Sequence, residues 1–107
     1  MTSQYLYRVQ LNRPEILSEG PTEQEAEVLQ AHASYVDELA NQSKVLLAGR
    51  TQAATPEAFG IVIIAATTEA DAQAIMRNDP AVMHGVMRGE LFPYQIAFMA
   101  PDIQQHL

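Results

Sequence analysis

Residues 59–66 of the chain read FGIVIIAA, a run in which nearly every position is apolar. Continuous apolarity over a short segment is typical of a strand that is buried on both faces, whereas a strand with one wet face alternates between apolar and polar residues. A strand covered on both faces lies inside a sheet. The stretch therefore predicts a central strand, around which the rest of the chain is arranged.

Two further strands are predicted on the N-terminal side of this stretch. Residues 5–11 alternate with a period of two, with Tyr5, Tyr7 and Val9 on one face, which is typical of a half-buried strand. Residues 12–21 contain proline and glycine and predict a loop. Residues 44–48 predict a second strand, interrupted by Gly49.

A long helix is predicted between these two strands. Thr22 and Glu25 have the spacing of a capping box, in which each side chain satisfies a backbone N–H group of the other residue. The helix is expected to run to about Asn41. Its predicted apolar stripe consists of Ala26, Leu29, Ala33, Val36 and Ala40.

The C-terminal side of the central strand repeats this helix-then-strand order. Thr68 is the expected cap of a second helix, which the Asp79-Pro80 step ends. Residues 81–86 predict one more helical turn, and residues 90–99 contain the last strand, with Pro93 expected near its start. The apolar side of this second helix is expected at Ala70, Ala74 and Ile75.

The predicted order β-α-β-β-α-β is that of an α+β, ferredoxin-like fold, in which both helices cover one face of an antiparallel sheet. We expect one domain over residues 1–107, with its core at about 4–99 and a short tail at 100–107. Right-handed crossovers place the first and third strands in the centre. The second sheet face then exposes apolar side chains, and a second copy covering it would form a dimeric α/β barrel with a pocket inside.

Composition excludes several function classes. Thirteen acidic against six basic residues give a formal charge of −7, and the scattered arginines form no basic stripe for nucleic acid or an anionic membrane surface. The chain has no cysteine, which excludes thiolate catalysis and Cys-based metal sites. The longest apolar run is too short to span a bilayer, and the N-terminus lacks a secretion signal. These features predict a cytoplasmic protein.

The sequence resembles the YciI-like (YCII-related) family of small dimeric α/β-barrel proteins. The resemblance covers most of the chain, from Tyr5 to about Phe98. The residues that carry it are Thr22-Glu23-Gln24-Glu25, His32, Tyr35, Leu47-Ala48-Gly49, Gly60, Glu69-Ala70, Asp79-Pro80-Ala81-Val82, Gly85-Val86 and Pro93-Tyr94.

The resemblance implies a His–Asp pair at a pocket, here His32 and Asp79. It also implies a small-molecule enzyme, because the family includes a dehydrochlorinase of chlorinated hydroxyhydroquinone, and the wider barrel group includes muconolactone isomerases and cofactor-independent oxygenases. Two positions depart from the family pattern. Arg50 stands where proline usually follows Ala-Gly, which would favour an anionic ligand or simply face solvent, and Ser43 stands where the chain usually turns on glycine.

The chemistry of His32 and Asp79 fits proton transfer. A carboxylate bonded to one ring nitrogen fixes the tautomer and stabilises the imidazolium, so that the outer nitrogen can take a proton from a substrate. The alternative is a structural histidine beside an aspartate that only caps residues 81–86. His84 could complete a two-His-one-carboxylate metal site, but no paired-histidine spacing supports one, and no metal or cofactor is expected.

Four further residues are candidate ligand contacts: Tyr7, Arg8, Tyr35 and Arg50. Tyrosines stack on aromatic rings or stabilise an oxyanion, whereas Tyr7 would equally well serve as core packing. A buried Arg8 requires a carboxylate or an anionic ligand. We therefore expect a cofactor-independent lyase or isomerase of a small aromatic or anionic molecule, acting as a homodimer; the alternative is a non-catalytic dimeric binding module.

Overall fold

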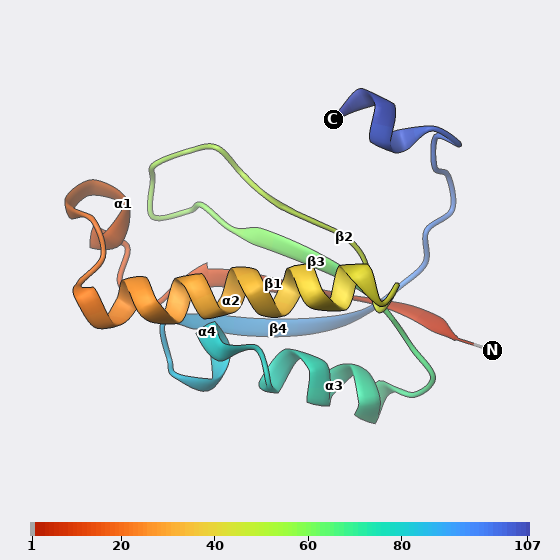
Figure 1. The fold of residues 1–107 in the computed structure, drawn as a ribbon, viewed down its shortest axis with the longest axis horizontal. Helices are drawn as coiled ribbons and strands as arrows, with labels where there is room; N and C mark the ends of the chain where they lie inside the picture. Colours follow the sequence, from red (N-terminus) through yellow and green to blue (C-terminus); the bar gives the residue numbers. More distant parts are fainter. Residues whose placement is uncertain (1) are drawn as a thin grey trace.

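The computed structural model describes residues 2–107 (Figure 1). Within these residues, four strands and five helical segments follow one another. They are β1 (Ser3–Leu11), α1 (Glu15–Glu19), α2 (Glu23–Asn41), β2 (Val45–Arg50), β3 (Gly60–Ala66), α3 (Glu69–Arg77), α4 (Pro80–Met83), β4 (Met87–Tyr94) and the 3-10 helix η1 (Ile103–His106).

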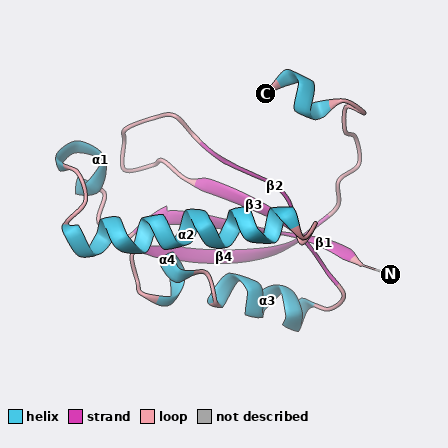
Figure 2. Cartoon of the chain, viewed as in Figure 1, coloured by secondary structure: helices cyan, strands magenta, loops and turns pink. Residues whose placement is uncertain are grey.

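The four strands form one antiparallel sheet in the order β2-β3-β1-β4. The predicted central positions of the first and third strands are therefore confirmed. Figure 2 shows the long helix α2 crossing the sheet, with α3 and α4 beside it. The fold is the α+β, ferredoxin-like arrangement that the element order predicted, with the short helices α1 and η1 added to it.

Strand β1 presents alternate residues to the two faces of the sheet. Tyr5, Tyr7 and Val9 are buried and pack with Ala72 and Met76 of α3, so this face is covered by helices. Leu6, Arg8 and Gln10 lie on the other face, which α2, α3 and α4 do not cover and which is called the open face below. In β3, opposite Leu6 and Arg8, the open face continues with Ile63 and Ile61.

The predicted apolar sides of the helices are right only in part. Leu29 and Val36 of α2 and Ile75 of α3 are half-buried, as predicted. The alanines of the two predicted sides are exposed, namely Ala26, Ala33, Ala40, Ala70 and Ala74. Outside the predicted sides, Tyr35 and Leu39 of α2 are half-buried, and Ala72 and Met76 of α3 are buried. The larger side chains remove more apolar area from water than the alanines do, and this decides which side of α2 faces the sheet.

Several boundaries also differ. The expected loop at residues 12–21 contains α1, β2 continues through Gly49 to Arg50, and the last strand ends at Tyr94 instead of continuing to residue 99. Pro93 lies near the end of β4 and not near its start. Because β4 is an edge strand, a missing N–H donor there leaves no ladder bond unmade.

The backbone of the turn after α2 explains why the family pattern has glycine where this chain has Ser43. Ser43 has a φ of 59°, in the left-handed region that costs residues with a side chain roughly 1–2 kcal/mol and costs glycine little. A glycine at this position would suit the backbone better than serine. In the part of the chain that the structure describes, no helix is long and apolar enough to cross a membrane.

The start of α2 is fixed by a capping box and an ion pair. Thr22 accepts a hydrogen bond from the Glu25 backbone N–H, and the Glu25 carboxylate accepts one from the Thr22 N–H. Arg13 binds the same carboxylate through Nε at 2.9 Å and a terminal nitrogen at 2.6 Å. These bonds attach the segment after β1 to the first turn of α2.

We predict that Glu25→Gln destabilises the protein strongly at pH 7 and much less at pH 2. Hydrogen bonds from Arg13 and the Thr22 backbone lower the pKa of Glu25 from 4.5 to about 2. The pair therefore stabilises the fold fully above pH 4.5, and this stabilisation is lost as the pH falls through about 2. Urea unfolding of the variant and wild type at both pH values measures the difference.

The matched control is Glu27→Gln, which removes an exposed carboxylate one turn into the same helix. It should change the midpoint less than Glu25→Gln at pH 7. Equal midpoint changes for the two variants would show that the Arg13 contact contributes nothing.

Candidate functional site

Asp79 is a buried acidic side chain between two helices. It follows α3 and is the N-cap of α4, with Pro80 at the first helical position. Its Oδ1 accepts a hydrogen bond from the Ala81 backbone N–H at 3.0 Å. The predicted capping role is therefore real. However, Asp79 is 0 % exposed, and a carboxylate buried to that extent requires more than one donor.

His32 supplies a second contact. It lies on α2, and its Nδ1 is 2.8 Å from both carboxylate oxygens of Asp79. Because an ionised carboxylate only accepts hydrogen bonds, Nδ1 carries the proton, and in the neutral ring Nε2 keeps its lone pair. The His32 side chain is 20 % exposed, and no residue between 2 and 107 forms a hydrogen bond with Nε2.

Tyr7 supplies the third donor. Its hydroxyl donates to Oδ2 of Asp79 at 2.8 Å from the helix-covered face of β1, where the side chain is fully buried. Burial, followed by the charge of Asp79 and the hydrogen bond to it, raises the pKa of Tyr7 far above 10. Tyr7 therefore stays protonated and remains a donor to the carboxylate.

Tyr35 lies one turn further along α2. Its hydroxyl donates to the backbone carbonyl of Ile75 at 2.7 Å. Burial, and secondly the charge of Asp79, raises the pKa of Tyr35. Because a hydroxyl has one proton to donate, Tyr35 cannot donate to a substrate oxyanion unless its hydrogen bond to the Ile75 carbonyl of α3 breaks.

The predicted ligand contacts are divided between the two faces of the sheet. Tyr7 and Tyr35 lie with His32 and Asp79 on the helix-covered face. Arg8 lies on the open face, where its guanidinium carbon is 4.9 Å from the centre of the Phe59 ring. Arg50 ends β2 and is exposed. The structure therefore brings together four of the six predicted site residues and separates Arg8 from them by the sheet. Arg50 lies by register on the helix-covered side, next to Gly60 and Val9, but forms no hydrogen bond with these four residues in the described part of the chain.

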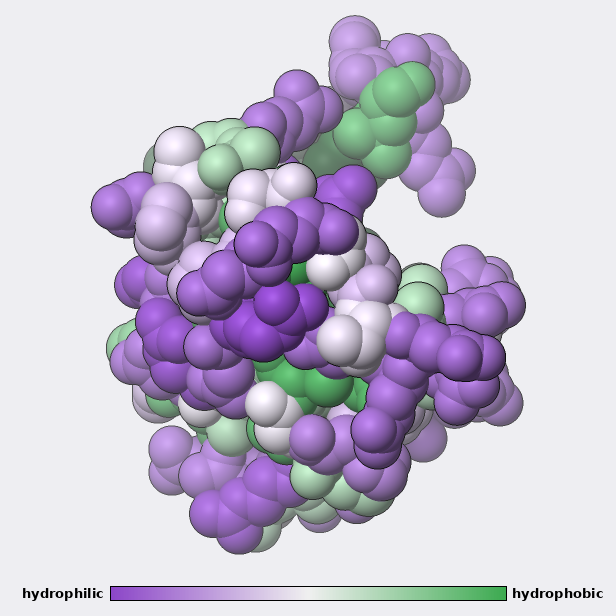
Figure 3. All heavy atoms as spheres, turned by 90° about the vertical axis from the view of Figure 1, so that its left-hand side faces the viewer, coloured by the Kyte–Doolittle hydropathy of each residue, from purple (hydrophilic) through white to green (hydrophobic). Residues whose placement is uncertain are grey.

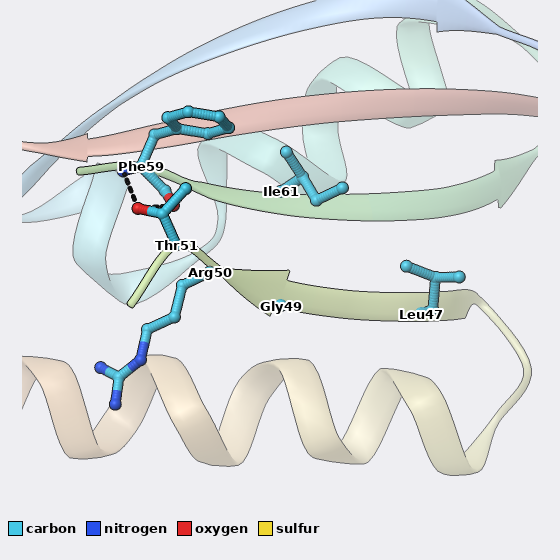
Figure 4. A pocket seen from close by; sticks show the side chains of 6 residues that line it. All are labelled: Leu47, Gly49, Arg50, Thr51, Phe59 and Ile61. Atoms are coloured by element: carbon cyan, nitrogen blue, oxygen red, sulfur yellow. Dashed lines mark hydrogen bonds between the residues drawn. The ribbon is translucent and has the colours of Figure 1, made fainter. Parts of the chain in front are cut away.

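Two hollows border the open face. One, of about 240 Å³, is lined by Leu47, Gly49, Arg50, Thr51, Phe59 and Ile61. In Figure 4 the Leu47, Phe59 and Ile61 side chains project away from α2, whereas Arg50 projects toward it. The other, of about 430 Å³, lies between Leu47, Ile63 and the segment 94–103. Neither hollow is lined by His32 or Asp79.

Two contacts could not be read from the sequence pattern. The alternation of β1 places Tyr7 on the buried face, but nothing local connects its hydroxyl to Asp79, 72 positions away. The sequence pattern assigns Phe59 only to an apolar strand, yet the Arg8 guanidinium lies over its ring. His84 is exposed, and residues 2–107 contain no group of three or more His, Cys, Asp or Glu side chains placed to hold a metal ion.

Comparisons with known proteins found one matching family and several solved structures with a similar fold. The model of a family described as the YCII-related domain matches residues 7–93. The solved structure of 5-chloro-2-hydroxyhydroquinone dehydrochlorinase from Burkholderia phenoliruptrix, in complex with 2,5-dihydroxybenzoquinone, is similar with a TM-score of 0.60 and 16 % identity. The matched region covers 85 % of this chain and 93 % of the dehydrochlorinase chain.

An uncharacterized protein from Thermotoga maritima is similar with a TM-score of 0.56 and 11 % identity, covering 89 % of this chain and 100 % of that one. At such identities, the two likenesses show a shared fold. No curated protein matches the chain.

We predict that Tyr7→Phe lowers the free energy of unfolding by about 1–3 kcal/mol, because it leaves a buried carboxylate with one donor fewer. Urea denaturation measures the change. Tyr94→Phe is the control, since Tyr94 is exposed and the loss of its hydroxyl should cost less than about 0.5 kcal/mol. Equal effects of the two substitutions would contradict a structural role for the Tyr7–Asp79 bond.

Proposed function

The chain belongs to the YCII-related family, and on that premise we propose that it is a cofactor-independent small-molecule enzyme of the lyase or isomerase type. His32 moves the proton and Asp79 holds its ring. The single observation that carries the proposal is the contact between His32 Nδ1 and the buried carboxylate at 2.8 Å, because it leaves Nε2 free to act as a base on a side chain that is 20 % exposed.

The proposed reaction begins with proton transfer to Nε2. In an elimination of HX, Nε2 takes a proton from the substrate, the electron pair of that bond forms a new double bond, and the halide leaves with the electrons of its bond to carbon. In an isomerisation, the same proton returns to another carbon. Asp79 stays ionised throughout and stabilises the imidazolium that forms.

The groups around Asp79 act as positioning residues. Tyr7 donates a hydrogen bond to one oxygen of the carboxylate, and the Ala81 N–H donates one to the other. These two bonds fix the orientation of the Asp79 carboxylate relative to His32. A base held in one orientation loses less free energy to ordering when the substrate arrives. The Tyr35 ring, close to His32 on the same helix, is proposed to contact the substrate through its face and not through its hydroxyl.

The similar structure from Burkholderia phenoliruptrix supports the substrate class. That protein is a dehydrochlorinase, and its structure is in complex with 2,5-dihydroxybenzoquinone. We propose that this chain, too, accepts a small ring compound that is aromatic or anionic. Halogenated hydroxyhydroquinones and ring lactones are the compounds to test first.

We further propose a cytoplasmic homodimer formed through the open face. Phe92 and Tyr94 of β4 belong to this face by register and are exposed. Beyond Tyr94 the chain continues as an arm in which Phe98 is 96 % exposed. Figure 3 shows this arm at the top of the view, carrying a hydrophobic area away from the body of the molecule. A second copy over the sheet would cover these side chains.

A non-catalytic dimeric binding module is the second candidate. It is favoured by one observation, namely that the hollows bordering the open face are lined by residues other than His32 and Asp79. Such a protein would bind its ligand without requiring a positioned base. The two functions predict different effects of removing the His32 imidazole: an enzyme would lose turnover, whereas a binding module would keep its ligand affinity.

We predict that His32→Gln lowers turnover of an accepted substrate by about 10²–10⁴-fold, the usual contribution of a general base. The measurement is halide release from chlorinated hydroxyhydroquinones, or the loss of substrate absorbance for lactones. The matched control is His84→Gln, which removes an exposed imidazole and should leave the rate unchanged.

Equal rates for wild type and His32→Gln would overturn the assigned base. Binding of 2,5-dihydroxybenzoquinone by both proteins with the same affinity, without turnover of any compound in the panel by wild type, would favour the binding module instead.

A further inference from the structure

The turn between α4 and β4 is held by the residue that follows β1. Asn12 donates a hydrogen bond from its side-chain amide to the Gly85 carbonyl at 2.8 Å, and one from its backbone N–H to the Val86 carbonyl at 3.0 Å. The second bond continues the pairing of β1 with β4 one residue beyond Leu11 and Met87. The end of β1 is therefore attached to the turn that ends α4.

Helix α4 depends on what holds its two ends, because it is only one turn long. A helix this short gains too little from its own hydrogen bonds to be stable by itself in water. Its N-terminal end is capped by Asp79. At its other end Gly85 has a φ of 72°, the left-handed conformation that commonly ends a helix. Asn12 binds this turn, and so it holds the end of α4 opposite to Asp79.

A continuous series of hydrogen bonds leads from this turn to His32. The Val86 N–H donates to the Ala81 carbonyl at 2.9 Å, and the Ala81 N–H donates to Oδ1 of Asp79 at 3.0 Å. The same oxygen is 2.8 Å from His32 Nδ1. A shift of the turn at Val86 would therefore move Ala81 and, with it, the carboxylate that faces the imidazole.

The apolar contacts of α4 do not replace these bonds. Ala81 is fully buried and Val82 packs against the core, which keeps the helix on the sheet. Apolar contacts are non-directional, whereas hydrogen bonds weaken steeply when their angle departs from linearity. Packing therefore determines that α4 lies on the sheet, and the hydrogen bonds from Asn12 determine where its last turn lies.

The residue after Asn12 attaches the helix that carries His32. Arg13 binds the Glu25 carboxylate of α2, about 10 Å before His32 along the helix at about 1.5 Å per residue. Figure 1 shows the end of β1, the turn after α4 and the first turn of α2 at the same end of the molecule. Two neighbouring residues are thus bonded to both elements that meet at the contact between His32 and Asp79.

We propose that Asn12 is a positioning residue for His32 and Asp79. It does not reach the reacting atoms; it holds the last turn of α4, so that the Asp79 carboxylate stays in line with Nδ1 of His32. The inference rests on the proposed function where it concerns turnover, whereas its effect on the imidazole is measured without a substrate.

The experiment measures how fast the Nδ1 proton of the neutral His32 ring exchanges with solvent, by NMR of wild type and Asn12→Ala. Asn12 is exposed, so its truncation opens no cavity in the core. The expected result is exchange about threefold to tenfold faster in the variant, the equivalent of one hydrogen bond. Asn12→Asp keeps the shape of the side chain but cannot donate to Gly85, and should exchange at least as fast as Asn12→Ala.

The matched control is Asn41→Ala, which truncates an exposed asparagine at the end of α2 and should leave the exchange rate unchanged. Urea unfolding of each variant establishes that the protein is folded during the measurement, so that faster exchange reports the local contact. Equal rates in wild type, Asn12→Ala and Asn12→Asp would overturn the proposal. Equally faster exchange in Asn12→Ala and Asn41→Ala would overturn it as well.

Turnover separates this inference from the proposed function. With an accepted substrate, Asn12→Ala should lower kcat by about the same factor as it raises the exchange rate and leave KM unchanged, because it disturbs the base and not the binding of substrate. Faster exchange in a protein that turns over no compound would support the positioning role and count against the enzyme. Turnover that requires His32, with unchanged exchange in Asn12→Ala, would support the enzyme and overturn the positioning role.

Discussion

The buried carboxylate of Asp79 is the interaction on which the helix-covered half of the molecule depends. It receives Tyr7 from β1, His32 from α2 and the Ala81 N–H from α4, so one side chain connects the sheet, the long helix and the short helix. Burying an unpaired charge costs several kcal/mol. The three elements must therefore meet where their donors reach the carboxylate, which also determines where the imidazole lies.

The same constraint explains why His32 suits proton transfer. The helix alone leaves its ring free to rotate, and the acceptor on Nδ1 removes that freedom and selects a tautomer. Tyr7, whose pKa is raised by burial and by Asp79, cannot compete as an acid. The proposed base thus depends on residues at positions 7, 32 and 79, and no two of them belong to the same helix or strand.

The two faces of the sheet have different chemistry because β1 alternates. Tyr7 takes part in the carboxylate cluster, and Arg8, one residue later, lies with Gln10 and Phe59 on the open face. This separation limits what one substrate could contact in a single subunit.

Local patterns were sufficient for the strands and for the first turns of the helices. The apolar run of β3, the alternation of β1, and Thr22 with Glu25 all depend on neighbours in sequence, and the structure confirms each of them. The buried sides of the helices, the end of β4 and helix α1 depend on packing, and the sequence pattern predicted them only in part or missed them. The family resemblance pointed to His32 with Asp79, but the donor from Tyr7 arises only when β1 pairs with its neighbours.

The most direct test of the account is the tautomer of His32, read from the ¹⁵N chemical shifts of its ring in the neutral state. We predict a proton on Nδ1 and an unprotonated Nε2 in wild type, and a change in that tautomer population in Asp79→Asn, whose side chain can donate as well as accept. A wild-type ring with its proton on Nε2, unaffected by Asp79→Asn, would contradict the paired base and leave His32 as a structural residue.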